Sequence, residues 1–189
     1  MEGSFAKLGG AATKLGGVMA AAFSVKLIKD FTQESLRAWG QQERAMNKLT
    51  LAVENSPLLT GDAADSLASF AAEMQKTTTI GDETTMAMQS MLASMDLTTE
   101  QINKTVKAAA NYSAAMDVDM TQAVRQLSKS YSGLQGELGE QIPAIRELTK
   151  EQLKNGDAID LINEKYAGMA EQLRGDTLGG VKVFTNAWG

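Results

Sequence analysis

The stretch "MAMQSMLASM", which begins at Met86, carries four thioethers in ten residues. Thioether sulfur can bind a soft metal such as copper(I), and it also fills gaps between packed helices. A helix turns by about 100° per residue. Met88, Met91 and Met95 therefore share one sector of the helix, and Met86 points to the opposite side. A copper site needs sulfurs that converge on one point, so the spacing favours a packed stripe and leaves copper(I) binding as the weaker alternative.

Few side chains suited to catalysis are present, because the chain has no histidine and no cysteine. This excludes disulfides, the usual zinc sites, thiol nucleophiles and histidine bases. Glu137 and Glu140 are the candidate carboxylate pair, in a stretch from Ser132 to Pro143 that is predicted to be a loop with at most a short helical turn. Acidic side chains in a loop are usually solvated. The sequence therefore predicts no catalytic residue, no cofactor and no metal.

The net charge of the chain indicates which classes of partner it can bind. The chain has 18 lysines and arginines against 23 aspartates and glutamates, for a net charge of -5, and no basic block. Binding to nucleic acid through its phosphates needs a basic surface that displaces counterions. We therefore expect no specific nucleic-acid binding.

The composition predicts an all-α protein. Pro57 and Pro143 are the two prolines, and good helix formers fill the long segments. The periodicity predicts an irregular bundle of about six helices, with one long N-terminal helix over residues 18–53. Breaks are expected at Pro57, at Gly81 and at Asp117.

Three regions are predicted. Residues 1–17 form a Gly/Ala-rich flexible segment, residues 18–175 form the helical domain, and residues 176–189 form the truncated start of a further helical segment. The apolar run from Val18 to Ile28 is too short for a membrane span, which needs about 20 residues. It leaves open an alternative function, a membrane-active helical protein that inserts through this run.

Several helix starts have local signals. Thr98 is followed by Gln101, and Thr149 is followed by Gln152; both pairs match a capping box. Asp119 is expected to cap the helix that follows it. Asp82 is expected to cap the methionine helix.

A last stripe runs through a helix predicted to start at Asp157 and to include Leu173. Its apolar residues recur at spacings of 3 and 4, which indicates a partner helix in this chain or in another subunit. Together with the methionine stripe, it gives the residues expected to contact a partner. They are Met88, Met91, Met95, Ile159, Ile162, Tyr166 and Met169.

The order of three phrases is more specific than any one of these features. They are "FAAEMQKTTTIGDETTMAMQSMLASM" from Phe70, "LTTEQINKTVKAAANYSAAMDVDMTQAVRQLSKSYSG" from Leu97, and "IPAIRELTKEQLKNGDAIDLINEKYAGMAEQ" from Ile142. Together they resemble the tail length tape measure proteins of long-tailed bacteriophages and prophages, and the resemblance covers most of residues 20–189.

The resemblance implies a helix-rich protein present in several copies inside the tail tube, whose length sets the tail length and which leaves the tail as DNA enters the host. It implies assembly in the bacterial cytoplasm and a place in the virion tail. The implied partners are the tube, the tail initiator, assembly chaperones, other copies of the chain and, during ejection, the host membrane. A single helix of 189 residues would span only about 280 Å. We therefore expect a compact helical segment of a longer protein.

Overall fold

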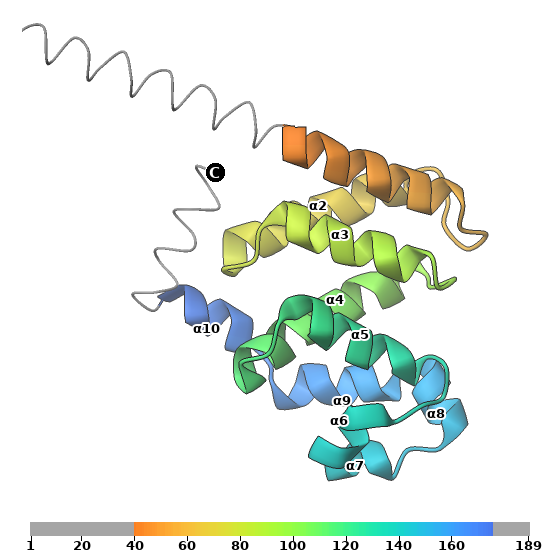
Figure 1. Ribbon diagram of the computed structural model, residues 1–189, viewed down its shortest axis with the longest axis vertical. Coiled ribbons are helices and arrows are strands. Elements are labelled where there is room, and N and C mark those ends of the chain that lie inside the picture. Colours follow the sequence, from red (N-terminus) through yellow and green to blue (C-terminus); the bar gives the residue numbers. More distant parts are fainter. Residues whose placement is uncertain (1–39, 176–189) are drawn as a thin grey trace, which may run out of the picture. The chain divides into compact units, whose positions relative to one another are not determined.

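The computed structural model describes residues 40–175, which form helices and connecting loops without any strand (Figure 1). Residues 40–54 are helical and precede the labelled elements. The labelled helices are α2 (Ala63–Thr77), α3 (Asp82–Ala93), α4 (Thr99–Met116), α5 (Met120–Ser130), α6 (Gly136–Gln141), α7 (Pro143–Arg146), α8 (Lys150–Asn155), α9 (Asp157–Lys165) and α10 (Met169–Gly175). The predicted all-α class is confirmed for this part of the chain.

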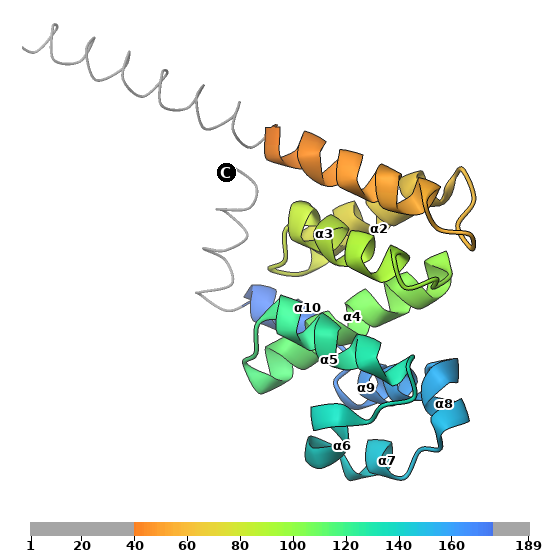
Figure 2. The same cartoon turned by 45° about the vertical axis from the view of Figure 1, so that its right-hand side comes forward.

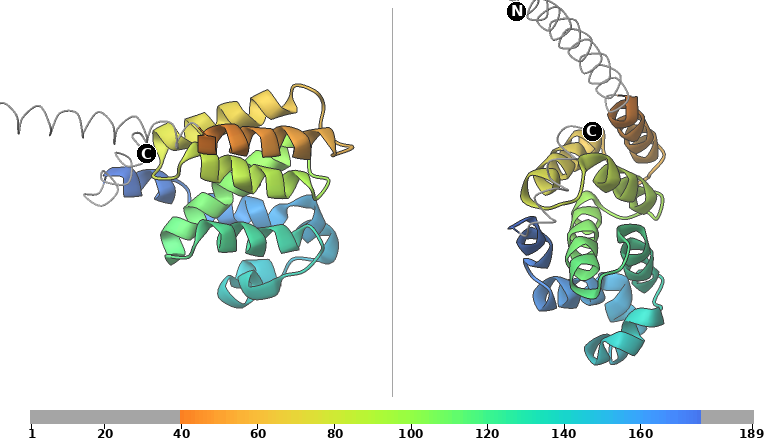
Figure 3. Two further views of the ribbon diagram at one scale, coloured as in Figure 1. Left: turned by 45° about the horizontal axis from the view of Figure 1, so that its top comes forward. Right: turned by 60° about the vertical axis from the view of Figure 1, so that its left-hand side comes forward.

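Helix α4 lies at the centre of the described fold. It packs against α2 and α3 on one side, and against α5, α9 and α10 on the others. Figure 2 shows α3 between residues 40–54 and α4, and Figure 3 shows α6 and α7 beyond α5. Three consecutive alanines of α4, Ala108, Ala109 and Ala110, are buried. Their small side chains let neighbouring helices approach closely, so α4 can be covered on several sides.

One apolar core joins these helices. Its largest fully buried apolar side chains come from nearly every element, which shows that the short helices α6 to α9 belong to the same core as the longer ones. They are Leu49, Leu67, Leu92, Ile102, Tyr112, Leu127, Leu138, Ile145, Leu153, Ile159 and Ile162.

The predicted capping boxes are confirmed. Thr98 accepts a 3.3 Å hydrogen bond from the backbone N–H of Gln101, whose side chain accepts a 3.0 Å bond from the Thr98 N–H. Thr149 makes the same exchange with Gln152. Asp119 caps α5 as predicted, through bonds from the N–H groups of two residues in its first turn. The prediction for α3 was off by one residue, since Gly81 is its N-cap and Asp82 its first residue.

The prediction of a single helix from Asp157 through Leu173 is wrong. Helix α9 ends at Lys165 and α10 begins at Met169. Between them Gly168 has φ +77°, a left-handed conformation that glycine adopts without the steric cost of a Cβ. The break lets α9 and α10 each pack on α4.

The expected number of helices, about six, is also too low for the described part of the chain. The region predicted as a loop contains α6, and α7 follows it with Pro143 in its first turn, where the missing N–H costs nothing. The Gln135 side chain donates to the carbonyl oxygens of Arg146, at 2.7 Å, and Leu148, at 3.2 Å. Arg146 donates to the carbonyl oxygen of Gly139 at 3.0 Å. These bonds between residues 7 to 13 positions apart hold the short helices in place.

Several predictions concern residues outside the described part. The long N-terminal helix is described only from residue 40 on, and the segments 1–17 and 176–189 lie wholly outside, as does the apolar run from Val18. Among the helices within residues 40–175, none is both long and apolar enough to cross a bilayer.

Candidate functional site

The methionines of α3 fill the core on more than one side of the helix. Met88 is buried, as the stripe predicts, and Met91 is half-buried against the core, as is Met95 in the turn just after α3. Met86, on the opposite side, is also buried, with 3% of its surface exposed. The side of the helix opposite to the predicted stripe is therefore packed as well. The physical reason is that α3 has helices on several sides, including α2 and α4.

The stripe of α9 is covered within the chain itself. Ile159 and Ile162 are 1% and 0% exposed, because α9 packs on α4. These two side chains, together with Met88, are not accessible to a partner in this fold. Tyr166 and Met169 are half-buried. Of the seven residues expected to contact a partner, those with open surface are Met91, Met95, Tyr166 and Met169.

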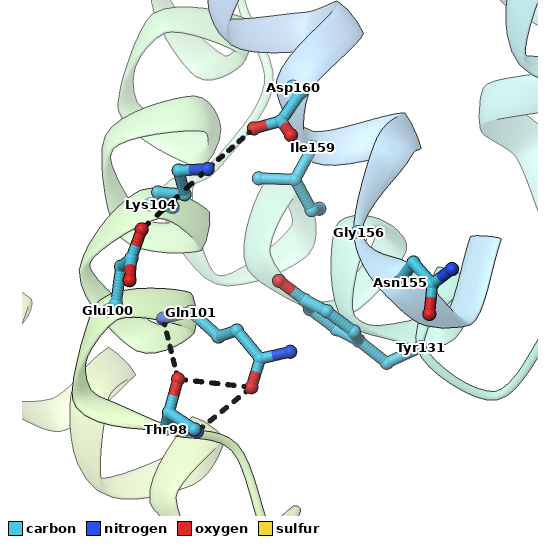
Figure 4. A pocket seen from close by; sticks show the side chains of 9 residues that line it. All are labelled: Thr98, Glu100, Gln101, Lys104, Tyr131, Asn155, Gly156, Ile159 and Asp160. Carbon is cyan, nitrogen blue, oxygen red and sulfur yellow. Dashed lines mark hydrogen bonds and ion pairs between the residues drawn. The ribbon is translucent and has the colours of Figure 1, made fainter. Parts of the chain in front are cut away.

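A polar pocket of about 320 Å³ opens between α4, the end of α5 and the junction of α8 with α9 (Figure 4). Its walls combine amide, carboxylate, ammonium and phenol groups. The lining residues are Thr98, Glu100, Gln101, Lys104, Tyr131, Asn155, Gly156, Ile159 and Asp160.

Lys104 is the cation of this pocket. Its ammonium nitrogen lies 3.1 Å from a carboxylate oxygen of Asp160 and 4.0 Å from one of Glu100. The hydrogen bond and the charge of Asp160 raise the pKa of Lys104 above its usual value, with a smaller contribution from Glu100. The Asp160 carboxylate therefore favours the charged amine, which can donate hydrogen bonds to a polar group.

Tyr131 and Gly156 form the opposite wall. The Tyr131 hydroxyl lies 3.0 Å from the hydroxyl of Thr105, and burial raises its pKa, so the phenol stays protonated. Gly156 has φ +96°, and a Cβ there would lie 3.5 Å from the Tyr131 ring. Chemically, the pocket offers hydrogen-bond donors and acceptors for a polar group.

No motif in the sequence predicts this pocket. Lys104 lies in α4, Tyr131 is the C-cap of α5 and Asp160 lies in α9, and dozens of residues separate them, so no local motif joins them. Two of its lining residues, Thr98 and Gly156, stand at helix boundaries that the sequence indicates. Such a signal predicts a turn at each position, but not that the two positions line the same pocket.

The two candidate carboxylates of α6 have different surroundings. The Glu137 carboxylate accepts a hydrogen bond from the side-chain NH2 group of Gln126. The side-chain oxygen of Gln126 is buried and has no hydrogen-bond partner. Glu140 is exposed, and its backbone carbonyl oxygen accepts a 3.3 Å hydrogen bond from the Arg146 side chain. Nearby, the hydroxyl of Tyr112 donates to Gln141. Hydrogen bonds of this kind tie α4, α5 and α6 together.

One carboxyl group has a raised pKa. Burial raises the pKa of Glu83, and the neighbouring Asp82 adds to the rise. Asp82 is itself buried and accepts a 3.0 Å bond from the side chain of Gln42. Within residues 40–175, no group of three or more acidic side chains is arranged to hold a metal ion.

Comparison of the chain with models of known families, with curated proteins and with solved structures found no match. The resemblance to tape measure proteins therefore rests on the three sequence phrases. The structure adds the arrangement of the helices that those phrases form.

Proposed function

We propose that this chain is a segment of a tail length tape measure protein of a long-tailed phage or prophage. Its role is structural and non-enzymatic, in tail assembly, in length determination and in DNA ejection. The observation that carries the proposal is the ordered series of three phrases that start at Phe70, Leu97 and Ile142. Three phrases in the same order are harder to match by chance than a helical composition.

The phrases correspond to a compact part of the protein. The first spans the second half of α2 and all of α3, the second spans α4 and α5, and the third spans α7 to α9 and the start of α10. The longest of these helices, α4, has 18 residues and is about 27 Å long. We therefore assign this segment to docking within the tail, with the measured length supplied by other helical sequence of the same protein.

The pocket chemistry suits the binding of polar groups. Lys104 and Tyr131 have raised pKa values and stay protonated at neutral pH. A protonated amine and a protonated phenol donate hydrogen bonds to polar groups, as a docking contact requires.

The proposed partners are the tube, the tail initiator, assembly chaperones and other copies of the chain, in the virion tail and in the host cytoplasm before it. The surface proposed for these contacts includes the half-buried side chains of Met91, Met95, Tyr166 and Met169. Methionine suits such surfaces because its flexible side chain adapts to different partners.

The test is to sequence the encoding DNA beyond Gly189 and to change the length of the reading frame. A long helical frame is expected, and its residue count times about 1.5 Å should equal the tail length seen by electron microscopy. Deleting a stretch of that frame in the phage or prophage should shorten the tails in proportion. Tails of unchanged length, or a frame that stops at once, would exclude the length-determining role.

In that event the membrane-active alternative becomes the leading proposal. Its specific support is the apolar run from Val18 to Ile28. Binding to liposomes that disappears when residues 1–28 are deleted would favour it.

A further inference from the structure

Met116, the last residue of α4, has the most open methionine side chain in the described part of the chain. The sequence has 11 methionines, of which Met1 and Met19 lie outside that part, which leaves nine. Met116 is 40% exposed, and the other eight are buried or half-buried. Oxidation of a thioether requires that the oxidant reach the sulfur, so exposure orders the reactivity of these nine residues.

The surroundings of the Met116 sulfur contain a second feature. The hydroxyl of Tyr166 points at this sulfur from a distance of 3.9 Å. Tyr166 lies just after α9, 50 positions further along the chain. A thioether is only a weak acceptor, so this hydroxyl has a poor partner in the reduced protein.

The position of Tyr166 is fixed by two ring contacts. Its ring meets that of Tyr112 edge to face, with centroids 5.9 Å apart, and the ammonium of Lys165 lies 5.6 Å from its centroid. Both contacts favour the observed orientation of the ring. The end of α4 is also fixed, since the Ser113 hydroxyl donates to the carbonyl oxygen of Val118 at 2.6 Å.

We propose that Met116 is an oxidation site at which a peroxide forms a sulfoxide, and that the Tyr166 hydroxyl then holds the new oxygen. In this reaction the sulfur gives an electron pair to one peroxide oxygen. The O–O bond breaks and an S–O bond forms; for hydrogen peroxide, the proton of the transferred oxygen passes to the leaving hydroxide, which departs as water. Sulfur is oxidised by two electrons and the peroxide is reduced by two.

The geometry accommodates the product. One oxygen atom bonded to sulfur fits between two atoms 3.9 Å apart if the contact bends at that oxygen, which leaves an O–H···O hydrogen bond of about 2.7 Å. A sulfoxide oxygen is a stronger acceptor than a thioether sulfur. The sulfoxide is also chiral, and only the epimer whose oxygen faces Tyr166 makes this bond.

The consequence is a tighter link between α4 and the connection from α9 to α10. Because Met116 is exposed, the more polar side chain does not have to enter the core. Oxidation of Met86 or Met120, both buried, would instead place a polar group among apolar ones.

The site of oxidation is tested by limited treatment of the intact protein with hydrogen peroxide, followed by peptide mass spectrometry. Met116 and the buried Met120 lie in one tryptic peptide, between Lys107 and Arg125, so Met120 is an internal control. We expect Met116 to be oxidised several-fold faster than Met120. Equal rates, or faster oxidation of another of the nine methionines, would overturn the proposal.

The role of Tyr166 is tested by amide hydrogen exchange of the reduced and oxidised protein. Oxidation should slow exchange around residues 166–170 by several-fold, and a methionine sulfoxide reductase should reverse this. Tyr166→Phe keeps the ring and lacks the hydroxyl, so oxidation of this variant should leave that exchange unchanged. Met116→Leu is the control that peroxide should not affect there. Unchanged or faster exchange in the oxidised wild-type protein would refute the holding role.

Discussion

The side-chain oxygen of Asn111, in the middle of α4, accepts a 3.1 Å hydrogen bond from the backbone N–H of Ala170, in the first turn of α10. The first N–H groups of a helix have no partner within it and need one from outside. Here a residue 59 positions earlier in the chain supplies the partner. Asn111 and Ala170 are 2% and 5% exposed, so water does not replace this bond easily.

Replacing Asn111 by alanine should therefore loosen α10. The buried N–H of Ala170 would lose its acceptor, and an unpaired buried donor costs about 1–3 kcal/mol. We expect the free energy of unfolding to fall by this amount and amide exchange in α10 to accelerate. Asn155→Ala, at an exposed position, is the control and should change neither measurement. An Asn111→Ala protein with unchanged exchange in α10 would contradict the capping role.

Gly168 gives a second test of the same connection. Its φ of +77° disfavours any residue with a Cβ, and the cost of such a left-handed conformation is about 1–2 kcal/mol. We expect Gly168→Ala to lower the free energy of unfolding by roughly 1 kcal/mol. Gly175→Ala is the matched control, because a Cβ there meets nothing within 4 Å. The control should leave the stability unchanged or slightly raised, as measured by urea denaturation.

Leu127 tests the core. Its side chain is completely buried in α5, so Leu127→Ala removes apolar contacts and leaves a cavity. The expected loss in the free energy of unfolding is about 2–5 kcal/mol. Leu51→Ala, at a position that is 60% exposed, should change it by less than about 0.5 kcal/mol. Similar losses for the two variants would contradict the described packing.

Asp119 should make the stability depend on pH. Hydrogen bonds from the N–H of Gln122, and to a smaller extent from Thr121, lower its pKa below 3.8. A carboxyl with a lowered pKa in the folded state stabilises the fold above the unfolded pKa, and this contribution is lost as the pH falls through the folded pKa. Asp119→Asn keeps a capping side chain but does not titrate. The free energy of unfolding of this variant, relative to that of the wild-type protein, should therefore rise as the pH falls from about 6 to about 2.5. Urea denaturation at each pH measures this difference.

Local signals predicted the parts of this fold that depend on neighbouring residues. The capping boxes at Thr98 and Thr149 were predicted because both partners of each bond lie within three positions. The break at Gly168 was missed because the apolar spacing of 3 and 4 continues through it. A glycine inside such a pattern can stay in a helix at a cost of about 1 kcal/mol. The break at Gly168 is favoured by the packing of α9 and α10 on α4, which the apolar spacing does not show.

Contacts between distant residues explain the other differences. The burial of Met86 depends on which helices surround α3, and periodicity alone cannot supply that information. The short helices after Gly133 depend on bonds from Gln135 to Arg146 and Leu148. The pocket depends on the meeting of Lys104 with Asp160, 56 positions apart by their residue numbers. None of these pairs leaves a signal in a short window of sequence.

The central position of α4 also bears on the order of folding. Its contacts with α3 and α5 close short loops, whereas its contacts with α9 and α10 close loops of dozens of residues and cost more chain entropy. We expect the α3–α5 region to form in the folding transition state and α10 to dock afterwards. In stopped-flow experiments, Leu127→Ala should then mainly slow folding, and Asn111→Ala should mainly speed unfolding.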